Sequence, residues 1–124
     1  MSKIKNCGVM IDCSRNAVPN VKWLKGFIDI IAKMGYNTVQ LYTEDTYEVT
    51  NEPQFGHMRG RFSKAELKEI DAYCTEKGIE LIPCVQTLAH FNQLFVWPDY
   101  ADFRDMGDVL LVDDERTYRL IENI

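Results

Sequence analysis

Short apolar runs alternate along the chain with longer segments in which apolar residues recur every three or four positions. The apolar runs at 8–12, 38–42 and 79–85 are rich in residues that favour strands. A polar stretch follows each of them. The pattern therefore predicts three strands with polar groups just beyond their carboxyl ends.

Helical spacing follows the first two runs. The first helix is expected to begin after Asn20 and to end at Gly35, because glycine readily adopts the left-handed conformation that stops a helix. Ser63 and Glu66 fit a capping box that opens the second helix, and Gly78 ends it. The apolar positions of the two stripes are Leu24, Phe27, Ile28, Ile31 and Met34, then Leu67, Ile70 and Cys74.

A third helical pattern opens near 113–114 and runs to the last residue, so the chain is expected to stop inside a helix. Strand and helix thus alternate three times. This order is the βαβ pattern, which requires a parallel sheet with right-handed crossovers.

Two architectures are compatible with this order. A doubly wound nucleotide-binding sheet would place a glycine-rich loop after the first strand, but residues 13–20 contain no glycine. In a (β/α)₈ barrel, polar residues at the strand ends form the site, as the pattern here suggests. We therefore expect an α/β fold with a parallel βαβαβα segment, the first three units of a (β/α)₈ barrel. The barrel would be incomplete, since eight units take about 250 residues.

Two segments lie outside these elements. The stretch 43–62 holds Pro53, Gly56 and Gly60, and a loop this long is a candidate binding loop. Its residues His57, Arg59 and Arg61 could border a ligand site or bind an anion, but nothing in their spacing requires it, so we interpret them as solvated loop charge. The segment 91–103 is rich in aromatic residues, which belong to a protein core more often than to a ligand site.

Composition narrows the class of protein. The 124 residues are 46% hydrophobic, enough for one domain or a piece of one. The net charge of −5 argues against non-specific binding to nucleic acid or an anionic membrane. No apolar run approaches the length of about 18 residues that a membrane span needs, and residues 1–6 lack a signal-peptide pattern. A soluble, cytoplasmic chain is expected.

The four cysteines form no Cys-x-x-Cys pair and lie in apolar segments. We interpret Cys7, Cys13, Cys74 and Cys84 as buried free thiols of a reducing compartment. No metal site and no cofactor are expected.

Three strand ends resemble one enzyme family. Gly8-Val-Met-Ile-Asp-Cys-Ser-Arg15, Tyr42-Thr-Glu-Asp45 and Leu81-Ile-Pro-Cys-Val-Gln-Thr-Leu-Ala-His90 occur in order along the chain. They are similar to the first three strand ends of the glycoside hydrolase family 20 β-N-acetylhexosaminidases, whose third segment usually reads Pro-Glu-hydrophobic-Asp-x-Pro-Gly-His. The resemblance covers about residues 8–121 and implies that 1–124 is the N-terminal portion of a family 20 catalytic (β/α)₈ domain.

The third segment departs from the family pattern. Cys84 stands where the family usually has Glu, and Gln86 stands where it usually has Asp. Leu88 and Ala89 replace the common Pro-Gly. The sequence looks like a divergent branch with a minimal, single-domain barrel, and Gln86 removes a carboxylate from any proton relay at that position.

The resemblance implies a reaction that removes terminal, non-reducing β-linked N-acetylglucosamine or N-acetylgalactosamine with retention. Catalysis in this family is substrate-assisted: the 2-acetamido oxygen attacks the anomeric carbon, an Asp orients the acetamido group and the adjacent Glu protonates the leaving oxygen. That Asp-Glu pair follows a fourth strand, so no catalytic residue is expected in this chain. The isolated chain should be inactive, with an amino-sugar glycoside as its partner.

The resemblance also assigns substrate-binding roles. Arg15 would bind the 3- and 4-hydroxyls of the terminal sugar, because a guanidinium donates to two adjacent oxygens. Asp45 and His90 would form the supporting polar network. Secondary candidates are Glu44, Gln86 and Trp97, with Tyr100 beside Trp97 as a sugar-stacking platform.

Two other functions stay open at this point. Three parallel strands expose apolar faces and unpaired edges, so a natural half-barrel could bind sugar or associate with itself to cover the open sheet edge. A small flavodoxin-like α/β domain is the other alternative. Gln86 speaks against it, because a receiver of that type needs Asp at the end of its third strand.

Overall fold

The computed structural model of the chain describes residues 4–15 and 17–124. Asn16, which completes the Asp-Cys-Ser-Arg-Asn sequence, lies outside the described residues, as do residues 1–3 of the segment that lacks a signal-peptide pattern.

Three parallel strands form a single sheet in the order β1-β2-β3. These are β1 (Gly8–Asp12), β2 (Thr38–Thr43) and β3 (Glu80–Val85). The register pairs Asp12 with Tyr42 and Tyr42 with Cys84. The three carboxyl ends therefore meet at one edge of the sheet, as the sequence pattern predicts.

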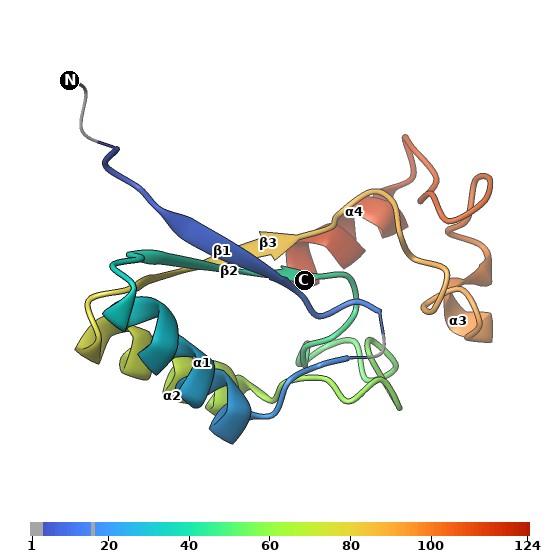
Figure 1. Cartoon of the computed structure of the whole chain (residues 1–124). Helices are drawn as coiled ribbons and strands as arrows, with labels where there is room; N and C mark the ends of the chain where they lie inside the picture. Colours follow the sequence, from blue (N-terminus) through green and yellow to red (C-terminus); the bar gives the residue numbers. More distant parts are fainter. Residues whose placement is uncertain (1–3, 16) are drawn as a thin grey trace.

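Two helices cover one face of this sheet (Figure 1). The first, α1 (Val21–Lys33), begins where the Asn20 side chain accepts a hydrogen bond from the Trp23 amide at 2.8 Å. The second, α2 (Lys64–Glu76), begins with the capping box predicted at Ser63. The first core lies between these helices and the sheet, and its buried members are Cys13, Leu24, Ile28, Ile31, Val39, Leu41, Phe62, Ile70, Cys74 and Ile79.

Among residues 4–15 and 17–124, no helix covers the opposite face of the sheet (Figure 1). Met10, Gln40 and Ile82 share one register row on this face, and Met10 is exposed. Side chains alternate between the two faces of a strand, so the row alternates with the Val9, Val39 and Leu81 row that packs toward the helices.

A second core lies beyond the carboxyl ends of the strands. It is built from loop 44–62, the segment 86–114 and the two remaining helices, α3 (Pro98–Ala101) and α4 (Glu115–Asn123). Its buried members are Val49, Phe55, Phe91, Leu94, Tyr100, Leu110 and Leu120. The aromatic segment is thus core, and α4 forms where the third helical pattern predicted it.

The cysteines follow the expectation in part. All four are free, and Cys13 and Cys74 are fully buried in the first core. Burial raises the pKa of each of these two thiols to about 11. Cys84 is half-buried and Cys7 is exposed, so the prediction is wrong for Cys7, which precedes β1 and lies outside the core.

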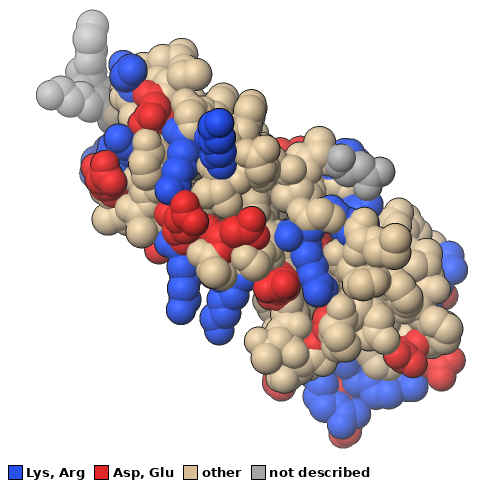
Figure 2. Space-filling view, turned by 90° about the horizontal axis from the view of Figure 1, so that it is seen from below, with Lys and Arg blue, Asp and Glu red and all other residues tan. Residues whose placement is uncertain are grey.

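The helical face is charged with both signs (Figure 2). Two ion pairs connect α1 with α2: Lys25 Nζ lies 2.6 Å from Glu69 Oε1, and Lys77 Nζ lies 3.2 Å from Asp29 Oδ1. Acidic and basic groups are interspersed rather than segregated on this face. None of the helices within the described residues has the length and apolar character to cross a membrane.

Candidate functional site at the strand ends

A tight turn after β1 positions the predicted arginine. Asp12 accepts hydrogen bonds from the Ser14 amide at 2.8 Å and from the Ser14 hydroxyl at 2.5 Å. These bonds hold the pKa of Asp12 below its ordinary value. Arg15 Nη1 donates in turn to Ser14 Oγ. The turn therefore holds one terminal nitrogen of the Arg15 guanidinium, while most of the side chain stays exposed.

Arg15 pairs with Glu44, which follows β2. The Nη1 to Oε1 distance is 2.6 Å, and the hydrogen bond that Arg15 donates to Glu44 raises the pKa of Arg15. The Arg15 side chain is 62% exposed and that of Glu44 only 10%. Tyr42 donates its hydroxyl to the same carboxylate oxygen at 3.4 Å. The nearly buried Glu44 carboxylate thus holds the Arg15 guanidinium at the surface, where most of it is exposed to solvent.

His90 completes this group from the loop after β3. Its Nδ1 lies 3.7 Å from Glu44 Oε1 and 3.5 Å from Asp108 Oδ2. The backbone of His90 has φ +69°, a left-handed conformation that is uncommon for residues other than glycine and that concentrates at functional sites. The imidazole therefore lies between two carboxylates from different loops.

These groups line one cavity of about 410 Å³. Its lining residues are Ser14, Arg15, Glu44, Arg59, His90, Asn92, Gln93 and Asp108. The structure thus brings together Arg15 and His90, two of the residues to which the resemblance assigned substrate-binding roles. It adds Asp108, for which the sequence gives no signal because the 86–114 segment has no periodic pattern.

Asp45 takes a different place from the one expected. Its carboxylate accepts from Arg59 Nε at 3.1 Å, and the side chains of Asp45 and Arg59 are 5% and 10% exposed. Burial raises the pKa of Asp45, while the Arg59 guanidinium acts in the opposite direction. The carboxylate that faces His90 is instead Glu44, one residue earlier.

Strand alternation explains this exchange. Glu44 lies two residues after Tyr42 and continues the open face of β2, whereas Asp45 continues the face that packs on the helices. A strict count of period two from β2 would have selected Glu44 from the sequence.

The interpretation of the loop cations as solvated charge is wrong for two of the three. Arg59 is nearly buried, and Arg61 donates to the carbonyls of Pro53, at 3.1 Å, and of Phe55. Both arginines fold the loop by satisfying backbone or carboxylate oxygens within it. His57 is exposed, and its ring lies edge-on to that of Trp97 with centroids 5.5 Å apart.

Three secondary candidates lie away from this cavity. The Gln86 backbone N–H donates to the Thr43 carbonyl at 3.2 Å, which extends the pairing of β3 with β2. Trp97 packs against the second core. Tyr100 is buried there and donates its hydroxyl to Glu52 Oε2 at 2.5 Å. Neither ring lines the cavity that holds Arg15.

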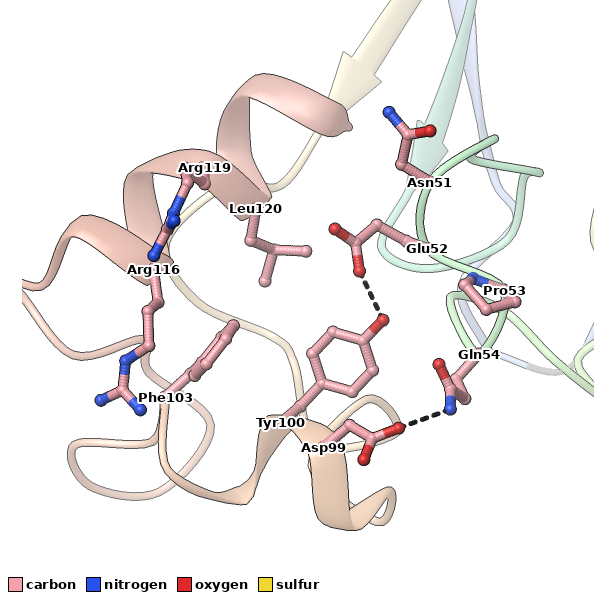
Figure 3. Close-up of a pocket in the computed structure, with 10 residues that line it drawn as sticks. All are labelled: Asn51, Glu52, Pro53, Gln54, Asp99, Tyr100, Phe103, Arg116, Arg119 and Leu120. Carbon is pink, nitrogen blue, oxygen red and sulfur yellow. Dashed lines mark hydrogen bonds between the residues drawn. The ribbon is translucent and has the colours of Figure 1, made fainter.

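A second cavity, of about 340 Å³, lies between α3, α4 and the 51–54 turn (Figure 3). Glu52 reaches the Tyr100 hydroxyl across it, and Gln54 Nε2 donates to Asp99 Oδ2 at 2.7 Å. These polar groups satisfy one another. These bonds join the 44–62 loop to the 86–114 segment at the second cavity. Within the described residues no three His, Cys, Asp or Glu side chains are grouped so as to hold a metal ion.

Comparisons with known proteins agree on one family. The model of the glycosyl hydrolase family 20 catalytic domain matches residues 6–115. A β-hexosaminidase of Akkermansia muciniphila is 29% identical, over 77% of this chain and 23% of its own length.

Solved structures show the same fold. The Streptomyces plicatus N-acetyl-β-hexosaminidase superposes with a TM-score of 0.80 at 23% identity, over 94% of this chain and 28% of that one. The Vibrio harveyi exo-β-N-acetylglucosaminidase gives 0.82 at 16% identity, over 96% and 24%. The chain thus spans about a quarter of the length of these relatives. The family match excludes the flavodoxin-like alternative, and the chain belongs to glycosyl hydrolase family 20, within its catalytic domain.

Proposed function

We propose that this chain is the N-terminal three-unit part of the (β/α)₈ catalytic barrel of a β-N-acetylhexosaminidase. The observation that supports this proposal most is the series Arg15, Glu44 and His90, which follow three successive parallel strands and line one cavity. In (β/α)₈ enzymes the loops at the carboxyl ends of the strands form the active site. The substrate is a glycoside with a terminal β-linked N-acetylglucosamine or N-acetylgalactosamine.

Arg15, Glu44 and Asp45 have different roles in holding the terminal sugar. Arg15 uses one guanidinium nitrogen for Glu44 and presents the rest of its fork to two adjacent sugar hydroxyls. Glu44 accepts from Arg15 and faces His90, so it orients both groups. Asp45 does not contact the sugar; it binds Arg59, which lines the same cavity.

The chemistry itself belongs to a segment after a fourth strand. In the substrate-assisted reaction of this family the acetamido oxygen of the sugar attacks the anomeric carbon, so no nucleophile from the protein is required. An Asp orients the acetamido group for this attack, and a Glu protonates the leaving oxygen as the glycosidic bond breaks. The acidic pairs described here have other partners: Glu44 and Asp45 bind arginines, and Asp114 caps α4. The isolated chain is accordingly proposed to bind sugar without turning it over.

The open side of β3 is proposed to receive the next barrel unit. A groove of about 510 Å³ lies along this strand beside α2, and apolar side chains including Leu67, Leu81, Val85 and Ile124 line it. An unpaired strand edge beside an apolar groove is unstable in water. Without a further unit, a second copy of the chain would cover it, and sedimentation equilibrium would then show a dimer.

Two measurements test the proposed function. Sequencing the coding DNA past codon 124 should reveal a continuing frame with another strand followed by Asp-Glu. A stop codon there would instead favour a sugar-binding half-barrel. The purified chain should show no release of chromophore from a chromogenic N-acetyl-β-glucosaminide, and turnover at rates ordinary for glycosidases would contradict the proposed division of roles.

A further inference from the structure

The loop after β2 contains a buried cation that connects two strand ends. Arg59 Nε donates to Asp45 Oδ1 at 3.1 Å, and its Nη2 donates to the carbonyl of Ser14 at 2.6 Å. Asp45 directly follows Glu44, and Ser14 directly precedes Arg15. One guanidinium therefore holds the neighbours of both members of the Arg15–Glu44 pair.

The backbone of the 44–62 loop places the Arg59 side chain against the strand ends. Gly56 has φ +66°, and a Cβ atom there would lie 1.9 Å from the Asp45 carbonyl oxygen, so the loop backbone packs directly on the strand end. The Arg59 amide donates to the Gly56 carbonyl at 3.1 Å, which closes the turn. The Arg59 side chain is 10% exposed in this turn.

Ser14 is also held from the other side. Asp12 accepts from both its amide and its hydroxyl. With Arg59 on the carbonyl, three polar groups of Ser14 are bound at the point where the chain turns toward Arg15. This arrangement restricts the backbone that aims the Arg15 side chain, although that side chain is itself largely in solvent.

We propose that Arg59 is a positioning residue of the sugar site. It fixes the loop after β1 relative to the loop after β2, and so sets where Arg15 stands in relation to Glu44. This inference rests on the proposed function, which gives Arg15 its sugar. Arginine suits this role because its planar guanidinium donates in several fixed directions, so it can contact Asp45 and the Ser14 carbonyl together. A lysine ammonium is a single charged centre and would replace one of these contacts more readily than both.

Binding of N-acetylglucosamine to the isotopically labelled chain, followed by NMR, tests this role. Arg59→Gln should weaken the affinity at least about tenfold, and Arg59→Lys should restore part of it. The matched control is Arg61→Gln, which removes a cation of the same loop that binds backbone carbonyls but contacts neither Ser14 nor Asp45. The control should bind sugar as the unaltered chain does.

A second readout does not depend on sugar. Arg59→Gln should speed amide hydrogen exchange at Ser14 and Arg15 and broaden the Arg15 Nε–H signal, while α1 and α2 keep their protection. If the charge left on Asp45 prevents folding, the double variant Asp45→Asn with Arg59→Gln removes both charges together and should show the same release of Arg15.

The outcomes separate the two proposals. Equal losses of affinity in Arg59→Gln and Arg61→Gln, or an unchanged Arg15 signal in the folded Arg59 variants, would overturn the positioning role. If the unaltered chain binds no sugar, the proposed function fails for this chain, and the Arg15 signal still decides whether Arg59 positions it.

Discussion

The two cores of this chain differ in how their residues are arranged along the sequence. The first core joins α1, α2 and the sheet, and its members recur at the periods of helices and strands. The second core gathers residues from the 44–62 loop, the 86–114 segment and α4, with no common period. The first is a repeating layer, whereas the second is a folded pair of loops placed over the strand ends (Figure 1).

The candidate site lies where these two regions meet. Arg15 and Glu44 extend from strand ends of the first region, whereas His90 and Asp108 come from the loops of the second. The regular layer therefore fixes where the site is. The loops determine which side chains complete it, so damage to the second core should disturb the site with less effect on the sheet.

A matched pair of truncations is expected to have the largest effect. Leu24→Ala in the first core and Leu94→Ala in the second remove the same atoms from fully buried positions. Each should lower the free energy of unfolding by about 2–5 kcal/mol, through lost burial and the cavity left behind. Urea unfolding measures the loss, and hydrogen exchange shows where protection disappears. Leu94→Ala should expose the 86–124 region while α1 and α2 remain protected. Equal loss of protection across the chain in both variants would show a single cooperative core.

Alanine substitutions at two glycines of the 44–62 loop distinguish the cost of a left-handed backbone from the cost of steric crowding. Gly56 and Gly60 both have φ +66°, but only at Gly56 would a Cβ meet other atoms. Gly60→Ala should therefore cost about 1–2 kcal/mol from the left-handed conformation alone. Gly56→Ala should cost about 1–3 kcal/mol more, because it forces the loop off the Asp45 backbone. Thermal denaturation compares the two. A Gly56 variant as stable as the Gly60 variant would mean that the loop does not pack against the strand end.

The smallest effect is expected at the start of α4. Hydrogen bonds from the Arg116 side chain and backbone lower the pKa of Asp114 to about 2. The folded pKa lies below the unfolded one, so this contribution to stability is present above about pH 4 and is lost as the pH falls toward 2. Asp114→Asn keeps the cap but not the ion pair. Its stability should fall less steeply between pH 4 and pH 2 in denaturant titrations, and a slope equal to that of the unaltered chain would contradict this account.

The sequence predicted the regular layer well. The three strands, α1, α2 and α4 lie at the positions that the spacing of apolar residues and the capping residues predicted. Those signals are local, and burial of one face enforces them. Glu44 was predicted only as a secondary candidate, because the alternation of β2 was not carried beyond its end, and the structure places Glu44 rather than Asp45 beside His90.

The loop contacts could not be predicted in this way. Arg59 meets Ser14 and Asp45, which are 45 and 14 positions away in the chain, so no neighbouring pattern distinguishes it from a solvated arginine. Asp108 reaches His90 only because the 86–114 segment folds back on its own aromatic core. Such contacts depend on tertiary packing, and their residues have no periodic signature.

The most direct test of the central claim is an NMR titration of the ¹⁵N-labelled chain with N-acetylglucosamine, repeated with Arg15→Ala. We expect chemical-shift changes at Ser14, Arg15, Glu44 and His90, around the cavity at the strand ends, and their loss in the variant. Shifts that are absent, that persist without the arginine, or that gather around Glu52 and Tyr100 in the second cavity would contradict the assignment of the sugar site.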